Sequence, residues 1–427
     1  MELGEKHPSI YQTAALGFAR GGHLSLLKGL NGYNPLDKEI PLCTEAAAGG
    51  HVDVLEWIKK NDFFPESGDI NDEMHFKVGK HGHLDALESI AERDQYYMSM
   101  VYNGAAYGGH LDLIEWLDDN GNNAEEMAGF SFDTGRGGHQ SIIDYCLKTV
   151  DVCAGSLTEG AAQGGHLDVL KQLENIKMLK ISPSTAIDAA IGGHIEVMKY
   201  LLEKGAKLNA ESIQKALDVG QLEMLKWILG NGLSWENTSI TTAAGQGYLK
   251  TVKWALENGC KYDSKASLKA VENGHLRVLE YFLAKGYELH KNCFEEALEK
   301  GHLNIIQCLS KIMKFPDKAF DCAVKSGDLD VLNWLLGNGY KPSNDAPTIA
   351  ATNSFLYVLE WLVEKGFEID ESLIEAVSKQ MENHRERGRR LEDSDDDQEV
   401  EVLEDSDDDD EQEEDPDDDE QEEDSDD

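Results

Sequence analysis

The chain lacks the sequence patterns that mark an enzyme, a secreted protein or a membrane protein. Its 427 residues contain no GxSxG motif, no phosphate-binding P-loop, no HExxH motif and no protein-kinase signature. No apolar run reaches the roughly 18 residues that a membrane-spanning helix needs. The first 25 residues contain no apolar segment after a basic start. These absences predict a soluble, non-enzymatic protein without a secretory signal.

Cysteines are few, and their spacing suggests no pairing. The seven cysteines form no CxxC pair, so the sequence offers neither a disulfide framework nor a zinc site. They are Cys43, Cys146, Cys153, Cys260, Cys293, Cys308 and Cys322. This usage predicts a reducing, intracellular compartment, either the cytoplasm or the nucleus, which would be that of a host cell if the chain is viral. No cofactor or metal is expected.

Positive charge is scarce, above all near the carboxyl end. The chain has 39 Lys+Arg against 82 Asp+Glu, a formal net charge of -43. Of the 36 residues from Glu392 to Asp427, 26 are acidic and none is basic. Removing these 26 from the total of 82 leaves 56 acidic residues, so residues 1–391 carry a net of -17. Direct nucleic-acid binding is not expected, because phosphate binding needs a basic face, whereas protein partners, including basic ones, are compatible with this charge.

The acidic tail, residues 391–427, is predicted to be disordered. It offers almost no apolar surface to offset the entropy of ordering, and its like charges repel. Ser394, Ser406 and Ser425 each precede Asp-rich runs, which resembles the preference of acidophilic kinases, so they are possible phosphosites. The arginine cluster at 385–390 could be a nuclear import signal or a favourable charge at a helix carboxyl end.

A short motif recurs along most of the chain. Near copies are GGHVDVLEWI at 49–58, GGHLDLIEWL at 108–117, GGHLDVLKQL at 164–173, GGHIEVMKYL at 192–201 and NGHLRVLEYF at 273–282. The residue after the glycine, termed the anchor, recurs at intervals of 26 to 32 residues. The anchors are His23, His51, His83, His110, His139, His166, His194, Gln221, Tyr248, His275, His302, Asp328 and Phe355. Thirteen repeats of about 27 residues are therefore predicted over residues 9–366.

Each repeat is predicted to be a hairpin of two short helices. Counted from the anchor, positions +4 and +7 are apolar in every repeat and position +1 in nearly every one, as on one face of an α-helix. Glycine follows seven of these helices at +11, where it ends a helix at least cost. Position -5 is alanine in ten repeats, and such a small residue lets two helices approach closely. Helices this short are marginal alone, so stability should come from stacking.

The run Ala-Ala-x-Gly-Gly-His-Leu-Asp-Val-Leu-Glu-Trp-Leu, ending in Asn-Gly or Lys-Gly, resembles the second half of an ankyrin repeat. It is especially similar to the short-period ankyrin arrays of large DNA viruses of protists and of some protists. The resemblance covers about five-sixths of the chain and implies a solenoid that binds proteins. Two features depart from the family: the period is near 27 rather than about 33 residues, and the Thr-Pro-Leu-His opening is absent. The β-hairpin fingers of the family should therefore be reduced to short loops.

The sequence thus predicts an all-α, ankyrin-type solenoid that forms one elongated stack. Residues 1–8 are assigned to an N-terminal arm and residues 9–366 to the ankyrin-like repeat array. Residues 367–390 are assigned to a C-terminal capping half-repeat, because Glu371 to Met381 repeat the first-helix pattern with Ala376 at the equivalent position. Residues 391–427 form the polyacidic tail.

Three recurrent sets of side chains are candidates for function. Nine histidines occupy the anchor, but adjacent helix pairs lie about 8–10 Å apart, too far for two rings to share a metal ion. We therefore expect them to form hydrogen bonds at helix starts and to pack. The aromatic residues at +6 in nine repeats should pack between repeats. Aromatic residues just after the closing glycines are candidate partner contacts, or could instead join one repeat to the next. They are Trp235, Tyr262, Tyr287, Tyr340 and Phe367.

Two functions are compatible with these observations. The first is a non-enzymatic scaffold or adaptor, active as a monomer, that binds protein partners through the repeat surface and uses the tail as an accessory. The alternative is a chaperone-like binder of basic proteins, such as histones, that acts mainly through the acidic tail.

Overall fold

A computed structural model of the chain describes residues 8–33, 36, 41–61, 63, 68–90, 95–121, 129–149, 152–353, 355–370 and 372–379. The predicted phosphosites Ser394, Ser406 and Ser425, the polyacidic tail and the arginine cluster lie outside these residues. So do residues 1–7 of the predicted arm, and residue 8 already belongs to the first helix.

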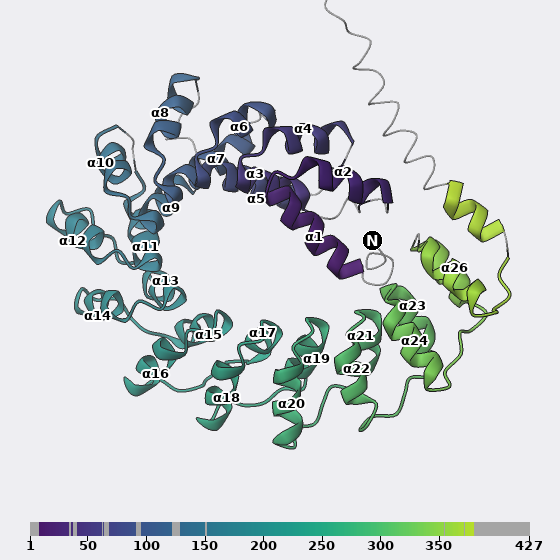
Figure 1. Cartoon of the computed structure of the whole chain (residues 1–427). Helices are drawn as coiled ribbons and strands as arrows, with labels where there is room; N and C mark the ends of the chain where they lie inside the picture. Colours follow the sequence, from purple (N-terminus) through teal and green to yellow (C-terminus); the bar gives the residue numbers. More distant parts are fainter. Residues whose placement is uncertain are drawn as a thin grey trace, which may run out of the picture.

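These described residues form an all-helical array with no strand among them. Twenty-six helices make thirteen successive pairs, each with an odd-numbered first helix and an even-numbered second helix (Figure 1). The first helices are α1 (Pro8–Arg20), α3 (Leu42–Gly49), α5 (Gly68–His81), α7 (Gln95–Gly108), α9 (Phe130–Gly137), α11 (Ala154–Gly164), α13 (Thr185–Gly192), α15 (Ala210–Asp218), α17 (Thr241–Gly245), α19 (Lys265–Glu272), α21 (Cys293–Glu299), α23 (Ala319–Ser326) and α25 (Ala346–Thr352). The second helices are α2 (Leu24–Tyr33), α4 (Val52–Lys60), α6 (Leu84–Ile90), α8 (Leu111–Asp119), α10 (Gln140–Thr149), α12 (Leu167–Asn175), α14 (Ile195–Glu203), α16 (Leu222–Gly230), α18 (Leu249–Glu257), α20 (Leu276–Ala284), α22 (Leu303–Leu309), α24 (Leu329–Gly337) and α26 (Leu356–Glu364). The predicted helical solenoid with thirteen helix pairs is confirmed.

The anchor marks the start of every second helix. Helix α2 begins directly after the first anchor, and the same offset holds for each pair through α26. The glycine before the anchor makes the turn between the two helices, as at Gly165, where φ is +84°. The closing glycine ends the second helix, as at Gly205, where φ is +100°. Residues with a side chain rarely adopt this left-handed conformation, so glycine fixes both turns of the frame.

The alanine at -5 lies in the core between neighbouring first helices. All ten of these alanines are fully buried: Ala46, Ala105, Ala161, Ala189, Ala216, Ala243, Ala270, Ala297, Ala323 and Ala350. Leucine, isoleucine, valine and methionine from the second helices cover them, as Leu170 and Met198 do in the middle of the array. The core is therefore a strip that runs along the array rather than a central cluster.

The array curves, whereas the sequence analysis predicted an elongated stack. Figure 1 shows the first helices along the inside of an open ring and the second helices along the outside. A Cβ atom on Gly104 of α7 would lie 2.1 Å from the carbonyl oxygen of Phe76 of α5, and one on Gly160 of α11 would lie 1.9 Å from that of Phe132 of α9. The inner backbones thus touch, while bulky leucine and tryptophan side chains separate the outer helices. A repeat that is narrow inside and wide outside must bend the stack.

Several anchor histidines connect their repeat to the one before it. His51 donates from Nε2 to the carbonyl oxygen of Arg20 at 3.0 Å, and His166 donates to that of Arg136 at 3.1 Å. The acceptor lies three residues before the preceding anchor, at the carboxyl end of a first helix, where carbonyls lack partners within the helix. Gln221 makes the same bond to Ile191 at 3.1 Å. The rings therefore donate to carbonyl oxygens of the preceding repeat and do not cap their own helix, although hydrogen bonds at the helix start had been expected from the sequence. Asp328 is an anchor that does cap its own helix.

The aromatic residues at +6 pack between successive repeats, as predicted. Trp254 makes an edge contact with Trp235, with ring centroids 6.0 Å apart. Tyr200 donates its hydroxyl to Glu174 of the preceding repeat at 2.8 Å. Tyr145 and Tyr102 both donate to the carboxylate of Asp118. The outer layer is thus held by ring packing and by hydroxyl–carboxylate bonds.

Beyond the last pair, residues 372–379 are helical, and Val377 is buried in the last part of the core. They lie in the segment that the sequence analysis assigned to the capping half-repeat. Within the described ranges, no helix combines the length and hydropathy needed to cross a membrane.

Replacing Ala243 with leucine should destabilise the array by about 1–3 kcal/mol, because the site is fully buried between first helices and overpacking forces a shift. The matched control is Thr242→Leu, at an exposed position on the same helix, which should change stability little. Chemical denaturation followed by circular dichroism measures both. Equal midpoints for the two variants would contradict close packing at -5.

Replacing His302 with alanine should cost about 0.5–1.5 kcal/mol, because the carbonyl oxygen of Glu272 loses a partner 3.1 Å away. His302→Gln should retain most of the stability, since Gln221 makes the equivalent bond in its own repeat. Denaturation midpoints of the two variants test this. If glutamine costs as much as alanine, the hydrogen bond is not what stabilises the junction.

Candidate functional site on the inner wall

The carboxyl ends of the first helices present a row of varied side chains on a constant frame. The row consists of the residues at -3 and is termed the helix-end row. Its members are Arg20, Ala48, Lys80, Tyr107, Arg136, Gln163, Ile191, Asp218, Gly245, Glu272, Glu299, Lys325 and Thr352. All except Gly245 are partly or fully exposed. Since each repeat contacts only its neighbours, these positions can differ in chemistry without disturbing the stack.

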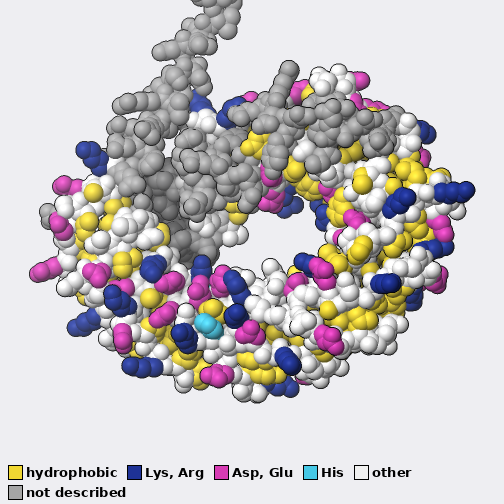
Figure 2. Space-filling view, turned by 180° about the vertical axis from the view of Figure 1, so that it is seen from behind, with side chains coloured by type: hydrophobic (Ala, Val, Ile, Leu, Met, Phe, Trp, Pro, Cys, Tyr) yellow, Lys and Arg dark blue, Asp and Glu magenta, His cyan; other side chains and the backbone are white. Residues whose placement is uncertain are grey.

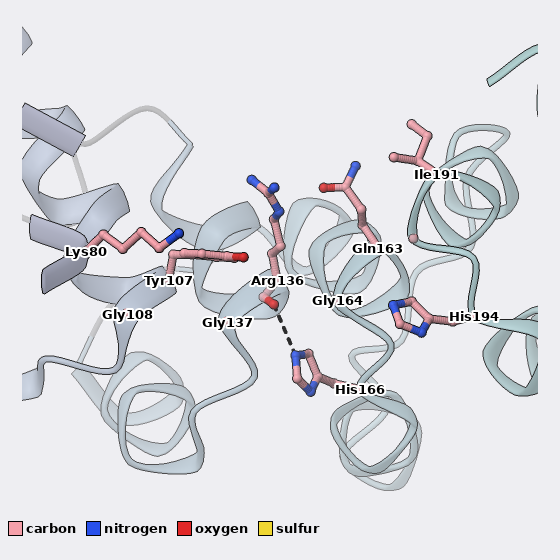
Figure 3. Close-up of a pocket in the computed structure, with 11 residues that line it drawn as sticks. Lys80, Tyr107, Gly108, Arg136, Gly137, Gln163, Gly164, His166, Ile191 and His194 are labelled. Carbon is pink, nitrogen blue, oxygen red and sulfur yellow. Dashed lines mark hydrogen bonds between the residues drawn. The ribbon is translucent and has the colours of Figure 1, made fainter. Parts of the chain in front are cut away.

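A hollow of about 600 Å³ lies along part of this row, from α5 to α13 (Figure 3). It is lined by Lys80, Tyr107, Gly108, Arg136, Gly137, Gln163, Gly164, His166, Ile191, Gly192 and His194. Four of these residues are glycines at -2 in successive repeats. A Cβ atom on Gly192 would lie 2.1 Å from the carbonyl oxygen of Gln163, so close helix packing requires glycine there. Because these four glycines carry no side chain, the hollow stays open.

Two cations flank the aromatic ring at the α5 end of the hollow. Lys80 Nζ and Arg136 Cζ each lie 4.8 Å from the centroid of the Tyr107 ring, a distance typical of cation–π contacts. Arg136 has one carboxylate nearby, Asp133, at 3.7 Å. Lys80 has no carboxylate partner among the described residues. Most of the donors on these two side chains therefore remain available to a ligand.

Several basic side chains lie near Lys80, although the chain as a whole is acidic. The pKa of His81 is lowered, first by burial and then by the neighbouring His83, Lys80, Arg20 and His110. Those neighbours belong to the first, third and fourth repeats, and the stacking of the repeats brings them together.

Two carboxyl groups on the first helices α9 and α13 have raised pKa values. Burial raises the pKa of Asp133 to about 6, although Arg136 opposes the shift. Burial, with a smaller contribution from Glu159, raises the pKa of Asp188 to about 7. Glu159 itself accepts hydrogen bonds from the hydroxyls of Ser182 and Ser184. Arg136 therefore meets less opposing charge from Asp133 than the sequence suggests.

The five loop aromatics lie elsewhere, and none of them lines the hollow. Trp235 donates from Nε1 to the carbonyl oxygen of Asn258 at 2.8 Å. Tyr262 stacks on Tyr287 with centroids 4.4 Å apart and donates to the carbonyl oxygen of Glu288 at 2.8 Å. The other two rings pack as well: Tyr340 stacks on Phe315 at 4.1 Å, and Phe367 lies against the last part of the core. All five are half-buried in contacts within the array.

The helix-end row and its hollow were not predicted from the sequence. The predictions rested on positions that repeat, whereas this site is built from positions that do not. Two signals were available. Glycine occupies -2 in four successive repeats, and a tyrosine and an arginine occupy -3 in the first two of these, after a lysine at -3 in the repeat before.

Folding should depend on pH through Asp188. Its raised pKa means that the folded chain holds this proton more tightly than the unfolded chain, whose value is 3.8. The resulting stabilisation is present below pH 4 and is lost as the pH rises through about 7. Asp188→Asn should therefore raise the unfolding midpoint at pH 8 more than at pH 5. Thermal unfolding at both pH values, with the exposed Glu203→Gln as control, tests this; an equal shift at both would contradict it.

Comparisons with known proteins agree with the repeated frame. The family model described as Ankyrin repeat matches residues 184–213, which span α13, α14 and the start of α15. No curated protein matches the chain by sequence.

Among solved structures, the chain is similar to the pentatricopeptide repeat protein PPR10 from maize. The identity is 13%, over 92% of this chain and 70% of that one, with a TM-score of 0.28. The same protein in complex with an 18-nt psaJ RNA element is 11% identical over 90% of this chain and 67% of that one, with a TM-score of 0.33. Scores this low give no basis for transferring function, RNA binding included.

The matched segment is one unit of the frame that all thirteen helix pairs share, with the same anchor at the start of each second helix and the same glycine before nearly every anchor. Residues 184–213 thus match an ankyrin repeat, within an array whose other helix pairs follow the same pattern.

Proposed function

We propose that this protein is a non-enzymatic interaction scaffold that binds a protein partner along the helix-end row, centred on the hollow between α5 and α13. Ankyrin-type repeats are typically binding scaffolds, and a stacked array offers a long surface without needing a catalytic site. The partner would be met in the cytoplasm or the nucleus, by the reasoning from cysteine usage given above.

The single observation that carries this proposal is the chemistry of the hollow. Lys80, Tyr107 and Arg136 stand next to Gln163 and Ile191, so cationic, aromatic, polar and aliphatic groups share one open surface (Figure 3). Tyrosine and arginine are enriched where proteins bind each other, because they combine apolar area with hydrogen-bonding groups. The recurrent positions of the repeats, by contrast, are used for packing within the array.

The second candidate is a chaperone-like binder of basic proteins that acts through residues 392–427. The density of 26 acids in 36 residues favours it. Phosphate on Ser394, Ser406 or Ser425 would strengthen such binding. The loop aromatics Trp235 and Tyr262, with their three counterparts, remain proposed as secondary contacts in either case.

Site-specific photocrosslinking tests the scaffold. A photoreactive side chain replaces Gln163 in the hollow or, as the matched control, Lys171, which is exposed on the outer helix α12. We expect the Gln163 position to trap a defined partner that unlabelled chain competes away, and the Lys171 position not to trap it. Equal trapping at both would contradict the inner-wall site.

A further variant separates the two candidates. In the neutral-tail chain, the acidic residues of 392–427 become asparagine and glutamine. A scaffold should keep its partner, with modest sensitivity to salt. A tail-driven binder should lose its partner in the neutral-tail chain. With the original acidic tail, its binding should weaken steeply as the Debye length falls from about 10 Å at 0.1 M to about 3 Å at 1 M salt.

A further inference from the structure

We infer that the hollow around Tyr107 is a docking site for the chain's own acidic segment, residues 392–427, so that the tail guards the proposed binding surface. This inference rests on the inner-wall site proposed above, but its test needs no partner.

The donors in the hollow suit carboxylates. Arg136 has five N–H groups and a single carboxylate at 3.7 Å, and the Lys80 ammonium has no carboxylate partner among the described residues. Carboxylate oxygens are the groups that a guanidinium and an ammonium bind most strongly. The nearest competing acid, Asp133, has a pKa of about 6 and is partly neutral just below pH 7.

The acceptors that would repel a carboxylate are already engaged. First-helix carboxyl ends carry carbonyl oxygens with partial negative charge. Here His110 donates to the carbonyl oxygen of Lys80, His139 to that of Tyr107 and His166 to that of Arg136, each at 3.1 Å. The anchor histidines thus remove the main obstacle to an anion at this end of the helices.

The spacing of the two cations matches a run of acidic residues. Because each lies 4.8 Å from the same ring centroid, Lys80 Nζ and Arg136 Cζ are at most about 10 Å apart, roughly the length of three residues of extended chain. Carboxylates at i and i+2, which lie about 7 Å apart on the same face of an extended chain, can therefore contact both. The runs 407–411 and 417–420 consist entirely of Asp and Glu, so several registers fit.

The tail is long enough to reach the hollow from the other end of the array. Forty-eight residues follow residue 379, with a contour length of about 160 Å. Thirteen repeats spaced by 8–10 Å give an inner circumference of about 100–130 Å and hence a width of about 30–40 Å. A flexible chain of this length has a mean end-to-end distance of about 40 Å. Tethering then gives an effective concentration in the millimolar range, at which even weak charge contacts become populated.

Charges along the opening of the ring do not form one block of a single sign. Figure 2 shows both basic and acidic side chains around the opening. On the far side, Lys325 of the helix-end row is already paired with Glu299 at 2.7 Å, and Lys269 with Glu272 at 2.6 Å. The cations beside Tyr107 are therefore the ones that an acidic segment should select.

Zero-length carbodiimide crosslinking of the full-length chain at low salt tests the docking. We expect peptide mapping to link Lys80 to carboxylates of residues 392–427 with about tenfold higher yield than Lys171, an exposed lysine on the outer face. Mixing light and isotopically heavy chains separates links within a chain from links between chains. A yield at Lys80 no higher than at Lys171, or links mainly between chains, would overturn the inference.

A charge-matched pair of variants provides the second readout. In Lys80→Gln with Arg136→Gln, the nuclear magnetic resonance signals of residues 392–427 should sharpen, and an added synthetic peptide of that segment should bind about tenfold more weakly to a chain with a neutral tail. The control, Lys171→Gln with Lys253→Gln, removes the same charge from the outer face and should change neither. Arg136→Lys should keep most of the effect. Unchanged signals in the folded Lys80–Arg136 variant would overturn docking. Sharpened signals together with undiminished binding of an external partner would instead count against the proposed function alone.

Discussion

Contact between the backbones of adjacent first helices is the constraint on which the rest of the structure depends. Alanine at -5, and glycine at several further positions between α5 and α13, leave at most a methyl group between neighbouring helices. Gly160 against Phe132 is the tightest example. The second helices keep leucine, tryptophan and tyrosine between them, so the stack must curve. Curvature and the open hollow both follow from one distribution of small and large residues.

The same contact explains why the hollow can carry charge. Helix ends packed this closely expose rows of carbonyl oxygens, which would be costly if left without donors. An imidazole from the next repeat supplies the donor at several junctions, as His110, His139 and His166 do. Where the anchor is Tyr248, the hydroxyl of Thr251 donates to a different carbonyl oxygen of the preceding repeat, that of Gly220 in the turn, at 3.0 Å. With these oxygens satisfied, Lys80 and Arg136 are left to interact with a ligand.

The sequence allowed the frame to be predicted but not the site. Repeat number, helix starts and the burial of residues such as Ala243 follow from periodic patterns, because the same local physics recurs in each repeat. The acceptor of each histidine could not be derived, since it lies about 30 residues earlier and depends on how repeats stack. Curvature depends on differences of an ångström between inner and outer spacing. The meeting of Lys80, Tyr107 and Arg136 required three-dimensional stacking, because these residues are 27 and 29 positions apart in sequence.

The anchor also makes the array modular in evolution. A Cβ atom on Gly22 would lie 2.5 Å from Nδ1 of His51, and one on Gly138 would lie 2.3 Å from Nδ1 of His166, so each ring occupies the space left by the glycine of the preceding repeat. Every junction of this kind consists of a glycine from one repeat and an anchor ring from the next. A gene duplication or deletion that moves one whole repeat therefore joins a matching glycine to a matching ring at both new boundaries. The lineage can lengthen or shorten the array by recombination, while the side chains of the helix-end row diverge independently.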